Sequence, residues 1–241
     1  MTDRAPSCFL AGEKIDLHAI TEDSIPEWSS WFNDPRITRY LPQGVFPNTI
    51  EDQRRFVARA SEVGRFLAHV RNRSGRLLGV VSLSDIDHLK RSCQMAAVMP
   101  TKDADAPYAT QEAICLITEH AFKTLDLDRV WAGQAFPGNV RWSHALELIG
   151  YVTEGVHRSV GRIDREPFDV IRIAITYNDF QRITDRRGGT LWPGERAMKE
   201  MFKALDDHRP YAETVDHLLV AARREQDDWL ASIDANCLDA R

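Results

Sequence analysis

The sequence predicts a mixed α+β domain in which a mainly antiparallel sheet is flanked by helices. Three apolar stretches, residues 65–70, 77–83 and 93–99, follow one another with polar turns between them, as in an antiparallel meander. Helical patterns stand before and after this meander, which favours the α+β class over a strictly alternating arrangement. Because 43% of the 241 residues are hydrophobic, the chain can also bury a sizeable core.

One strand and two helices are predicted before the meander. Residues 15–20 alternate apolar and polar side chains, which is typical of a half-buried strand. Residues 21–32 begin with capping candidates and then place apolar side chains at helical spacing. Residues 36–48 contain two prolines and a glycine, and we predict a loop there. Thr49 with Asp52 then marks the start of a second helix.

The chain after the meander contains further helices and strands. An apolar face at helical spacing predicts a helix over residues 110–124. Shorter patterns predict a strand at 130–135, a helix at 140–149, and strands at 152–158 and 168–176.

We therefore predict one domain over residues 9–180 and a C-terminal helical extension over residues 181–241. The second helical pattern of the extension has an apolar face that needs a partner surface, which is this domain, its cleft or a second subunit. That face comprises Val215, Leu218, Leu219, Ala222, Trp229, Leu230 and Ile233.

Charge and cysteine content narrow the class of protein. A net charge of −5, without any basic stripe, argues against binding to nucleic acid or to an anionic membrane. No run of roughly 18 apolar residues occurs, so we expect a cytoplasmic protein. The four cysteines are scattered without the close pairs of metal or redox motifs, so we expect reduced thiols and no metal site. A small molecule or a protein is the expected partner.

Residues 139–151 carry the most specific motif. Asn139, Glu147, Gly150 and Tyr151 fit the pattern N-x-x-S-x-R-x-x-E-K-x-G-F at unchanged spacing. Residues 31–35 are similar to a second pattern, W-x-N-D-P. On these motifs, residues 9–180 resemble the GNAT superfamily, in the branch that includes acetyltransferases of ribosomal-protein N-termini, aminoglycosides and amino sugars.

The resemblance implies where acetyl-CoA would bind. In this fold two neighbouring strands splay apart, here residues 94–99 and 130–135, and their backbone groups bond the pantetheine arm. The next helix directs its N-terminus at the pyrophosphate, where the helix dipole favours an anion. The cofactor-binding candidates implied in this way are Ala97, Val98, Met99, Tyr108, Ala109, Thr110, Asn139, Trp142 and His144.

One loop and two single positions depart from the family pattern. The pyrophosphate loop, Q/R-x-x-G-x-G/A in the family, has Asp105, Tyr108 and Thr110 at its signature positions. A carboxylate about 6 Å from a phosphate would repel it by on the order of 2 to 3 kcal/mol at an effective dielectric near 20. Gln94 stands where many relatives have a glutamate base, and Trp142 where the family usually has serine.

Other side chains are therefore candidates for proton transfer. Asp85 and His88, together with Asp87, lie in the turn before the strand of Gln94 and are alternative bases, unless they form only a solvated turn. Tyr151 is a candidate donor of a proton to the leaving thiolate, unless it belongs to the core.

The acceptor site is predicted from the same resemblance. Its candidate residues are Trp31, Arg36, Arg39, Tyr40 and Gln94. The two arginines favour an anionic acceptor. The predicted reaction is transfer of an acetyl or related acyl group from acyl-CoA to a small-molecule amine or a peptide N-terminus by direct attack, in a possible homodimer.

An alternative stays open. A GNAT-like domain could lack acetyl-CoA chemistry and serve as a binding or assembly module, or catalyse a different reaction in the same cleft. The glycine-free loop and Gln94 favour this alternative, whereas Asn139 and the intact segment 79–99 favour the enzyme.

Overall fold

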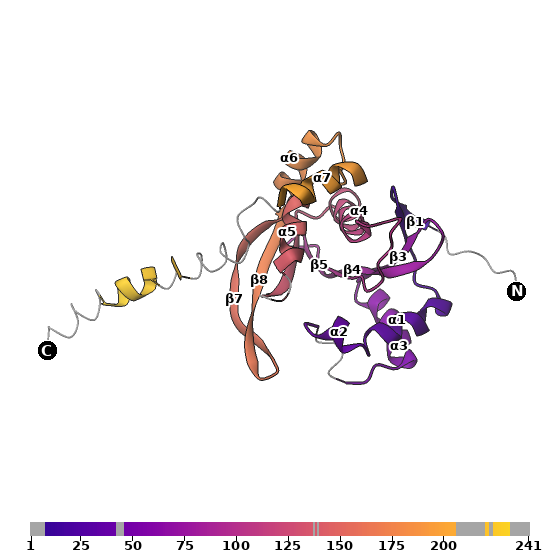
Figure 1. The fold of residues 1–241 in the computed structure, drawn as a ribbon, viewed down its shortest axis with the longest axis horizontal. Helices are drawn as coiled ribbons and strands as arrows, with labels where there is room; N and C mark the ends of the chain where they lie inside the picture. Colours follow the sequence, from indigo (N-terminus) through magenta and orange to yellow (C-terminus); the bar gives the residue numbers. More distant parts are fainter. Residues whose placement is uncertain are drawn as a thin grey trace, which may run out of the picture.

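A twisted eight-stranded sheet forms the centre of the molecule (Figure 1). The structure is a computed structural model, and it describes residues 8–41, 46–136, 138, 140–205, 220–221 and 224–231. The strand order is β1-β2-β3-β4-β5-β6-β8-β7. The strands are β1 (Cys8–Ala11), β2 (Ile15–His18), β3 (Phe66–Asn72), β4 (Leu77–Asp87), β5 (Ser92–Val98), β6 (Arg129–Phe136), β7 (Val152–Ile163) and β8 (Glu166–Thr176).

All neighbouring strands pair antiparallel except β5 and β6, which are parallel. The predicted meander is confirmed, because β3, β4 and β5 pair in sequence order. β1 was not predicted, since four residues are too few to establish an alternating pattern and the strand gains its identity from pairing with β2.

Helices cover both faces of the sheet (Figure 1). They are α1 (Ile25–Trp31), α2 (Pro35–Thr38), α3 (Ile50–Glu62), α4 (Ala109–Lys123), α5 (Val140–Ile149), α6 (Tyr177–Arg186) and α7 (Glu195–Leu205), with a 3-10 turn at Glu22–Ser24. α1, α2 and α3 lie on one side, and α4 to α7 lie on the other. Every helix of the described residues is too short or too polar to cross a membrane.

Two helices differ from the sequence-based expectation. The loop predicted over residues 36–48 begins as a helical turn, α2, because the Asp34 side chain accepts a bond from the Arg36 amide and Pro35 fits the first helical position. α6 was not predicted, although Thr176 and Asp179 form a capping box at its start.

The C-terminal extension joins the main hydrophobic core as far as α7. Leu191 and Met198 are fully buried in the same cluster as the side chains between the sheet and α4. Of the apolar face predicted for the last helix, Trp229 and Leu230 are exposed, and the other five residues lie outside the described part of the chain. The boundary at residue 180 stays a prediction.

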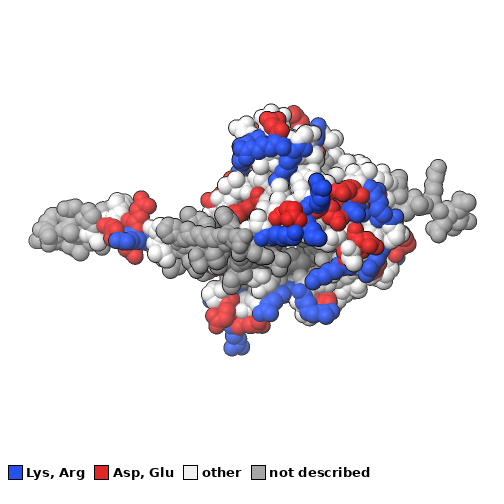
Figure 2. Space-filling view, turned by 45° about the horizontal axis from the view of Figure 1, so that its top comes forward, with Lys and Arg blue, Asp and Glu red and all other residues white. Residues whose placement is uncertain are grey.

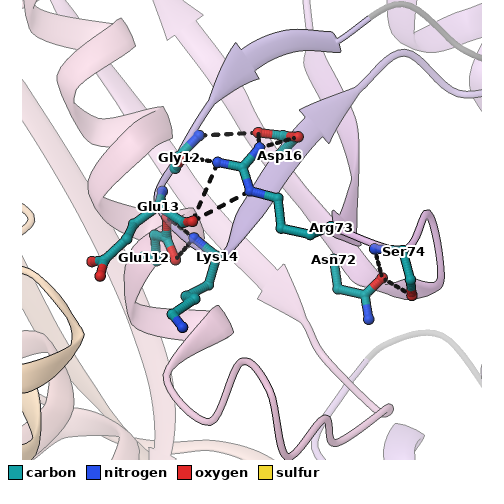
Figure 3. Close-up of polar contacts among 8 residues, drawn as sticks. All are labelled: Gly12, Glu13, Lys14, Asp16, Asn72, Arg73, Ser74 and Glu112. Atoms are coloured by element: carbon teal, nitrogen blue, oxygen red, sulfur yellow. Dashed lines mark hydrogen bonds and ion pairs between the residues drawn. The ribbon is translucent and has the colours of Figure 1, made fainter.

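The turn between β1 and β2 ties three parts of the molecule together (Figure 3). Buried Glu112 of α4 accepts the backbone N–H groups of Glu13 and Lys14. Arg73 donates to backbone carbonyls of the same turn and to both oxygens of Asp16, at 2.7 and 2.9 Å. The Glu13 carboxylate in turn accepts from the Trp192 indole N–H at 2.8 Å, so the turn also anchors the segment that leads into α7.

Surface charges are largely balanced by neighbours of opposite sign. Basic and acidic side chains lie interspersed over the face drawn in Figure 2. Arg91, for example, contacts Asp126 at 2.7 Å and Asp128 at 2.6 Å. Such exposed pairs contribute little to stability, but they reduce the net field of the surface.

Candidate active site

A cleft opens where β5 and β6 separate. The two strands pair in parallel at only three positions, the last of which joins Gln94 to Trp131. Beyond this point residues 95–98 and 132–136 do not pair with each other. The resulting cleft has a volume of about 760 Å³, and its floor is formed by residues 94–98 of β5, the adjoining Met99, and residues 132–134 of β6. The predicted splay is therefore confirmed.

The cleft has two differently composed walls. On the side of α1 and α3 it is lined by apolar and aromatic side chains, which are Trp28, Phe32, Leu41, Phe56, Leu67 and Val80. On the opposite side it is lined by Thr110 and Gln111 of α4, Trp142 and Ala145 of α5, and Phe202 of α7. The opening between the strands connects these walls, so a ligand held by α4 and α5 could reach the aromatic side.

Most predicted cofactor-binding residues border this cleft. Ala97, Val98, Met99, Thr110 and Trp142 line it. The described residues Tyr108, Ala109 and His144 do not contribute to the lining, although Tyr108 stacks on the lining residue Phe202 at 5.3 Å between ring centroids. Asn139 lies outside the described residues.

The loop before α4 is held by Asp103. Its carboxylate accepts the backbone N–H of Asp105 at 2.9 Å and a side-chain bond from Asn72, and these bonds lower the pKa of Asp103. Asp105 itself is exposed. Tyr108 occupies the N-cap position of α4 without a side-chain capping bond from any described residue. The loop thus has a defined shape without the glycines of the family pattern, and it leaves the N-terminus of α4 for an anion.

Polar groups gather where the two strands part. Gln94 pairs across the sheet with Ser84 of β4, and both line the cleft together with Ser82. Gln134 of β6 is only 3% exposed, and its side-chain carbonyl accepts a bond from the Ser143 hydroxyl. Its amide nitrogen has no partner among the described residues.

The candidate bases follow Ser84 in the β4–β5 turn region. Asp85 is exposed with a φ of 50°, at an irregularity in the β4–β5 register. His88 is exposed in the following turn. The Asp87 carboxylate accepts the backbone N–H groups of Leu89 and Lys90 at 2.9 Å, and the bonds from Lys90 lower its pKa. None of these three side chains lines the cleft.

Tyr151 lies in the core. Its hydroxyl is 2.7 Å from the Thr118 hydroxyl, and burial raises its pKa far above the ordinary value. It does not line the cleft either, which matches the core alternative weighed for it above.

The predicted acceptor residues fall into two groups. Gln94 lines the cleft, whereas Trp31 is buried in the second hydrophobic cluster beneath α1 and α3. Arg36 is bound to Asp34 at 2.7 Å, and Arg39 contacts Asp164 of the β7–β8 hairpin at 3.4 Å. These two arginines do not contribute to the cleft lining.

Tyr40 connects α2 to the same hairpin. Its ring meets the Phe168 ring at 6.4 Å in an edge-on arrangement, and a Cβ on Gly138 would collide with it. Gly138 therefore allows the chain to pass close to Tyr40. Like the neighbouring Arg39, Tyr40 borders the hairpin rather than the cleft.

Arg65 is a cleft residue that the sequence did not indicate. It precedes β3, and its guanidinium lies over the Phe56 ring at 5.2 Å. Arg65 is the one charged side chain among the described residues that line the cleft, because the others include no Asp, Glu, His, Lys or further Arg. No ion pair joins it to a carboxylate in the described part of the chain.

One group of metal-ligating side chains lies elsewhere, on β1 and β2. The ligand atoms of Cys8, Asp16 and His18 are all within 4.8 Å of one another. Both Asp16 oxygens, however, already accept bonds from Arg73, and this guanidinium would repel a cation. A metal site would need a carboxylate that is free to bind the ion, whereas that of Asp16 is already paired with Arg73.

Comparisons with known proteins agree with the fold and the cleft. The sequence pattern of the acetyltransferase (GNAT) domain matches residues 14–152. No curated protein matches the sequence. The solved structure of spermidine N-acetyltransferase from Vibrio cholerae in complex with CoA and spermine is similar, with a TM-score of 0.63 and 18% identity over 70% of this chain and 98% of that one. The GNAT-family acetyltransferase from Bacillus anthracis gives a TM-score of 0.58 and 21% identity over 69% of this chain and 97% of that one.

Proposed function

Because the chain belongs to the GNAT acetyltransferase family, whose domain pattern covers more than half of its length, we propose that it transfers an acetyl group to a primary amine by direct attack on a thioester. Acetyltransferases of this family take the acetyl group from acetyl-CoA, which is therefore the co-substrate. The observation that carries the proposal is the separation of β5 and β6 after Gln94, which opens a cleft through the sheet.

The residues present fit the two parts of acetyl-CoA. Backbone groups of residues 95–98 and 132–136 are not used in pairing the two strands, so they can bond the amides of a pantetheine arm. The uncapped N-terminus of α4, with Thr110 and Gln111 in its first turn, suits the diphosphate. Phe202 would cover this arm from the side of α7.

The side chains that line the cleft determine how the acceptor ammonium can lose its proton. Since its described lining contains no carboxylate or imidazole, no side chain there accepts the ammonium proton. We propose that the acceptor loses this proton to water and attacks as the neutral amine. An alkyl amine with a pKa near 10 is neutral in only about one part in a thousand at pH 7, so amines of low basicity would react faster.

A second candidate function is that of a domain with the same fold that does not catalyse acetyl transfer. The glycine-free loop with Asp105, and the amide of Gln94 in place of a base, favour a domain that binds a ligand or a partner in this cleft without transferring an acetyl group. Calorimetric titration of the full chain with acetyl-CoA separates the two candidates. We expect a dissociation constant well below about 1 mM. Absence of binding, with no thermal stabilisation at saturating acetyl-CoA, would refute the acetyltransferase.

Location and assembly belong to the same proposal. We propose a cytoplasmic enzyme that acts on a small-molecule amine. A homodimer was expected from the last helical pattern, most of which lies outside the described residues, and size-exclusion chromatography with light scattering would test it.

A further inference from the structure

We infer that the acceptor is an amine with an apolar or aromatic body and a carboxylate, that Arg65 receives this carboxylate, and that polyamines are excluded. The inference rests on the proposed function, because it assigns the aromatic side of the cleft to the acceptor. Arg65, Trp28, Phe56 and Gln94 are the residues that carry it.

Arg65 is placed to bind an anion inside the cleft. It lines the cleft, is partly buried, and places its guanidinium over the Phe56 ring, 5.2 Å from the ring centroid. The described residues give it no carboxylate partner. A guanidinium offers parallel N–H groups that match a carboxylate in two bonds, and such bonds strengthen where water is partly excluded.

The anion bound by Arg65 would belong to the acceptor rather than to acetyl-CoA. Arg65 stands on the side of α1 and α3, beside Phe56 and Leu67. The N-terminus of α4, where the diphosphate would bind, lies on the opposite face of the sheet (Figure 1). A ligand that reaches Arg65 while its amine meets the thioester must therefore enter from the α1 and α3 side.

The same wall is unsuited to a cation. Its apolar side chains belong to the hydrophobic cluster around Trp28, and no Asp or Glu is present among the described lining residues. A polyamine would lose hydration at several charges without a counter-charge and would meet Arg65 as well, which is unfavourable.

The composition of this wall therefore favours an acceptor that differs from the polyamine named for one structural neighbour. The Vibrio cholerae protein is a spermidine N-acetyltransferase, and its structure contains spermine together with CoA. At 18% identity that likeness concerns the fold, so the two chains can differ in the acceptor. We place the amine of this acceptor near Gln94 and Ser84, where the strands part, and its carboxylate at Arg65.

Binding of simple carboxylates tests the inference without requiring acetyl transfer. The full chain with saturating CoA is titrated with phenylacetate, phenethylamine and spermidine by calorimetry. We expect phenylacetate to bind at least about tenfold more tightly than phenethylamine, because the two ligands share a ring and differ in charge. Arg65→Gln should weaken phenylacetate binding by roughly 10- to 100-fold, and Arg65→Lys by less, since lysine keeps the charge but not the two parallel bonds.

The matched control is Arg59→Gln. Arg59 is exposed on α3 and does not line the cleft, so this change removes the same charge from the same region. It should leave phenylacetate binding within about twofold. Circular dichroism and thermal unfolding of each variant establish that it is folded.

The outcomes separate this inference from the proposed function. Tighter binding of spermidine or phenethylamine, absence of phenylacetate binding, or equal affinity in the folded Arg65→Gln variant overturns the inference. Acetylation is then assayed with phenylalanine, phenethylamine and spermidine. Acetylation of spermidine that is insensitive to Arg65→Gln would keep the acetyltransferase and refute the carboxylate site. Arg65-dependent phenylacetate binding without acetylation of any amine would keep the carboxylate site and refute the acetyltransferase.

Discussion

The ring of Tyr108 lies stacked on the ring of Phe202, with centroids 5.3 Å apart and an angle of 28° between the planes. The contact joins the N-cap of α4 to α7, two elements that are far apart in the sequence. Since Phe202 also lines the cleft, the C-terminal extension contributes a wall to the site proposed for acetyl-CoA.

Phe202→Ala should therefore weaken acetyl-CoA binding. An aromatic contact contributes about 0.5 to 1.5 kcal/mol beyond the area it buries, and the lost ring also opens the cleft to water, so we expect roughly a tenfold higher dissociation constant. Titration calorimetry measures it. Met201→Ala, on the same helix but outside the cleft lining, is the control. Unchanged affinity in Phe202→Ala would show that α7 is not part of the binding site.

Asp105→Asn should tighten acetyl-CoA binding. The side chain is exposed in the loop before α4, and its charge would repel the diphosphate in the proposed site. We expect a gain of roughly 3- to 10-fold at low ionic strength that shrinks as salt screens the repulsion. Asp105→Gly should tighten binding too, because it removes the same charge. Asp185→Asn, exposed on α6, controls for net charge. Weaker binding by Asp105→Asn at low salt would contradict this account of the loop.

Stability should decrease at acidic pH because of His69. The side chain is fully buried against Trp28, with ring centroids 5.5 Å apart, and neither ring nitrogen has a partner among the described residues. Burial, with a smaller effect of Arg71, lowers the pKa of His69 from 6.5 to about 4. Below pH 6.5 the unfolded chain binds a proton that the folded chain excludes. The stabilising contribution is thus complete above pH 6.5 and is lost as the pH falls towards 4.

Urea unfolding at several pH values measures this effect. Between pH 7 and pH 5 the wild type should lose about 2 kcal/mol more unfolding free energy than His69→Phe, which keeps a ring but cannot titrate. His88→Gln is the control, because His88 is exposed in the β4–β5 turn. Equal pH slopes for the wild type and His69→Phe would mean that His69 is protonated in the folded protein.

Local patterns predicted most of the fold. The strands of the meander were placed within a few residues because their apolar runs are bounded by polar turns. The opening after Gln94 followed from the family resemblance of the motif at residues 139–151, and the pairing of β5 and β6 confirms it. Short elements such as β1 could not be predicted, since their identity depends on a neighbour rather than on their own residues.

The walls of the cleft were harder to predict than its floor. Arg65 lies at a strand end and gains its place by stacking on Phe56 of another element. Phe202 lines the cleft in an extension that is held by the bond from Trp192 to Glu13 and by the buried Leu191. Arg39 looked suitable in sequence, but its partner Asp164, 125 residues further along the chain, becomes visible only in three dimensions. Long-range contacts of this kind leave no periodic signal.

Gln94→Glu should change the pH dependence of acetylation. Gln94 is the last residue of β5 that pairs with β6, where the proposed amine would meet the thioester, and the described lining has no base. In the wild type, log(kcat/KM) should rise by about one per pH unit up to the pKa of the acceptor amine, because only the neutral amine reacts. A glutamate at this position would take the proton from the bound ammonium. The profile should then become flat across neutral pH, with its lower limb set by the new carboxyl group.

The charge introduced at residue 94 should also shift acceptor preference, since a carboxylate near Ser84 attracts a cationic amine and repels the carboxylate of the acceptor proposed for Arg65. We expect kcat/KM at pH 7 for phenethylamine to rise relative to that for phenylalanine by roughly tenfold. Gln94→Leu, which adds no base, should retain the slope of the wild type. If the wild-type profile is already flat between pH 6 and 8, a base outside the described cleft lining removes the proton, and mutation of Asp85 and His88 becomes the next measurement.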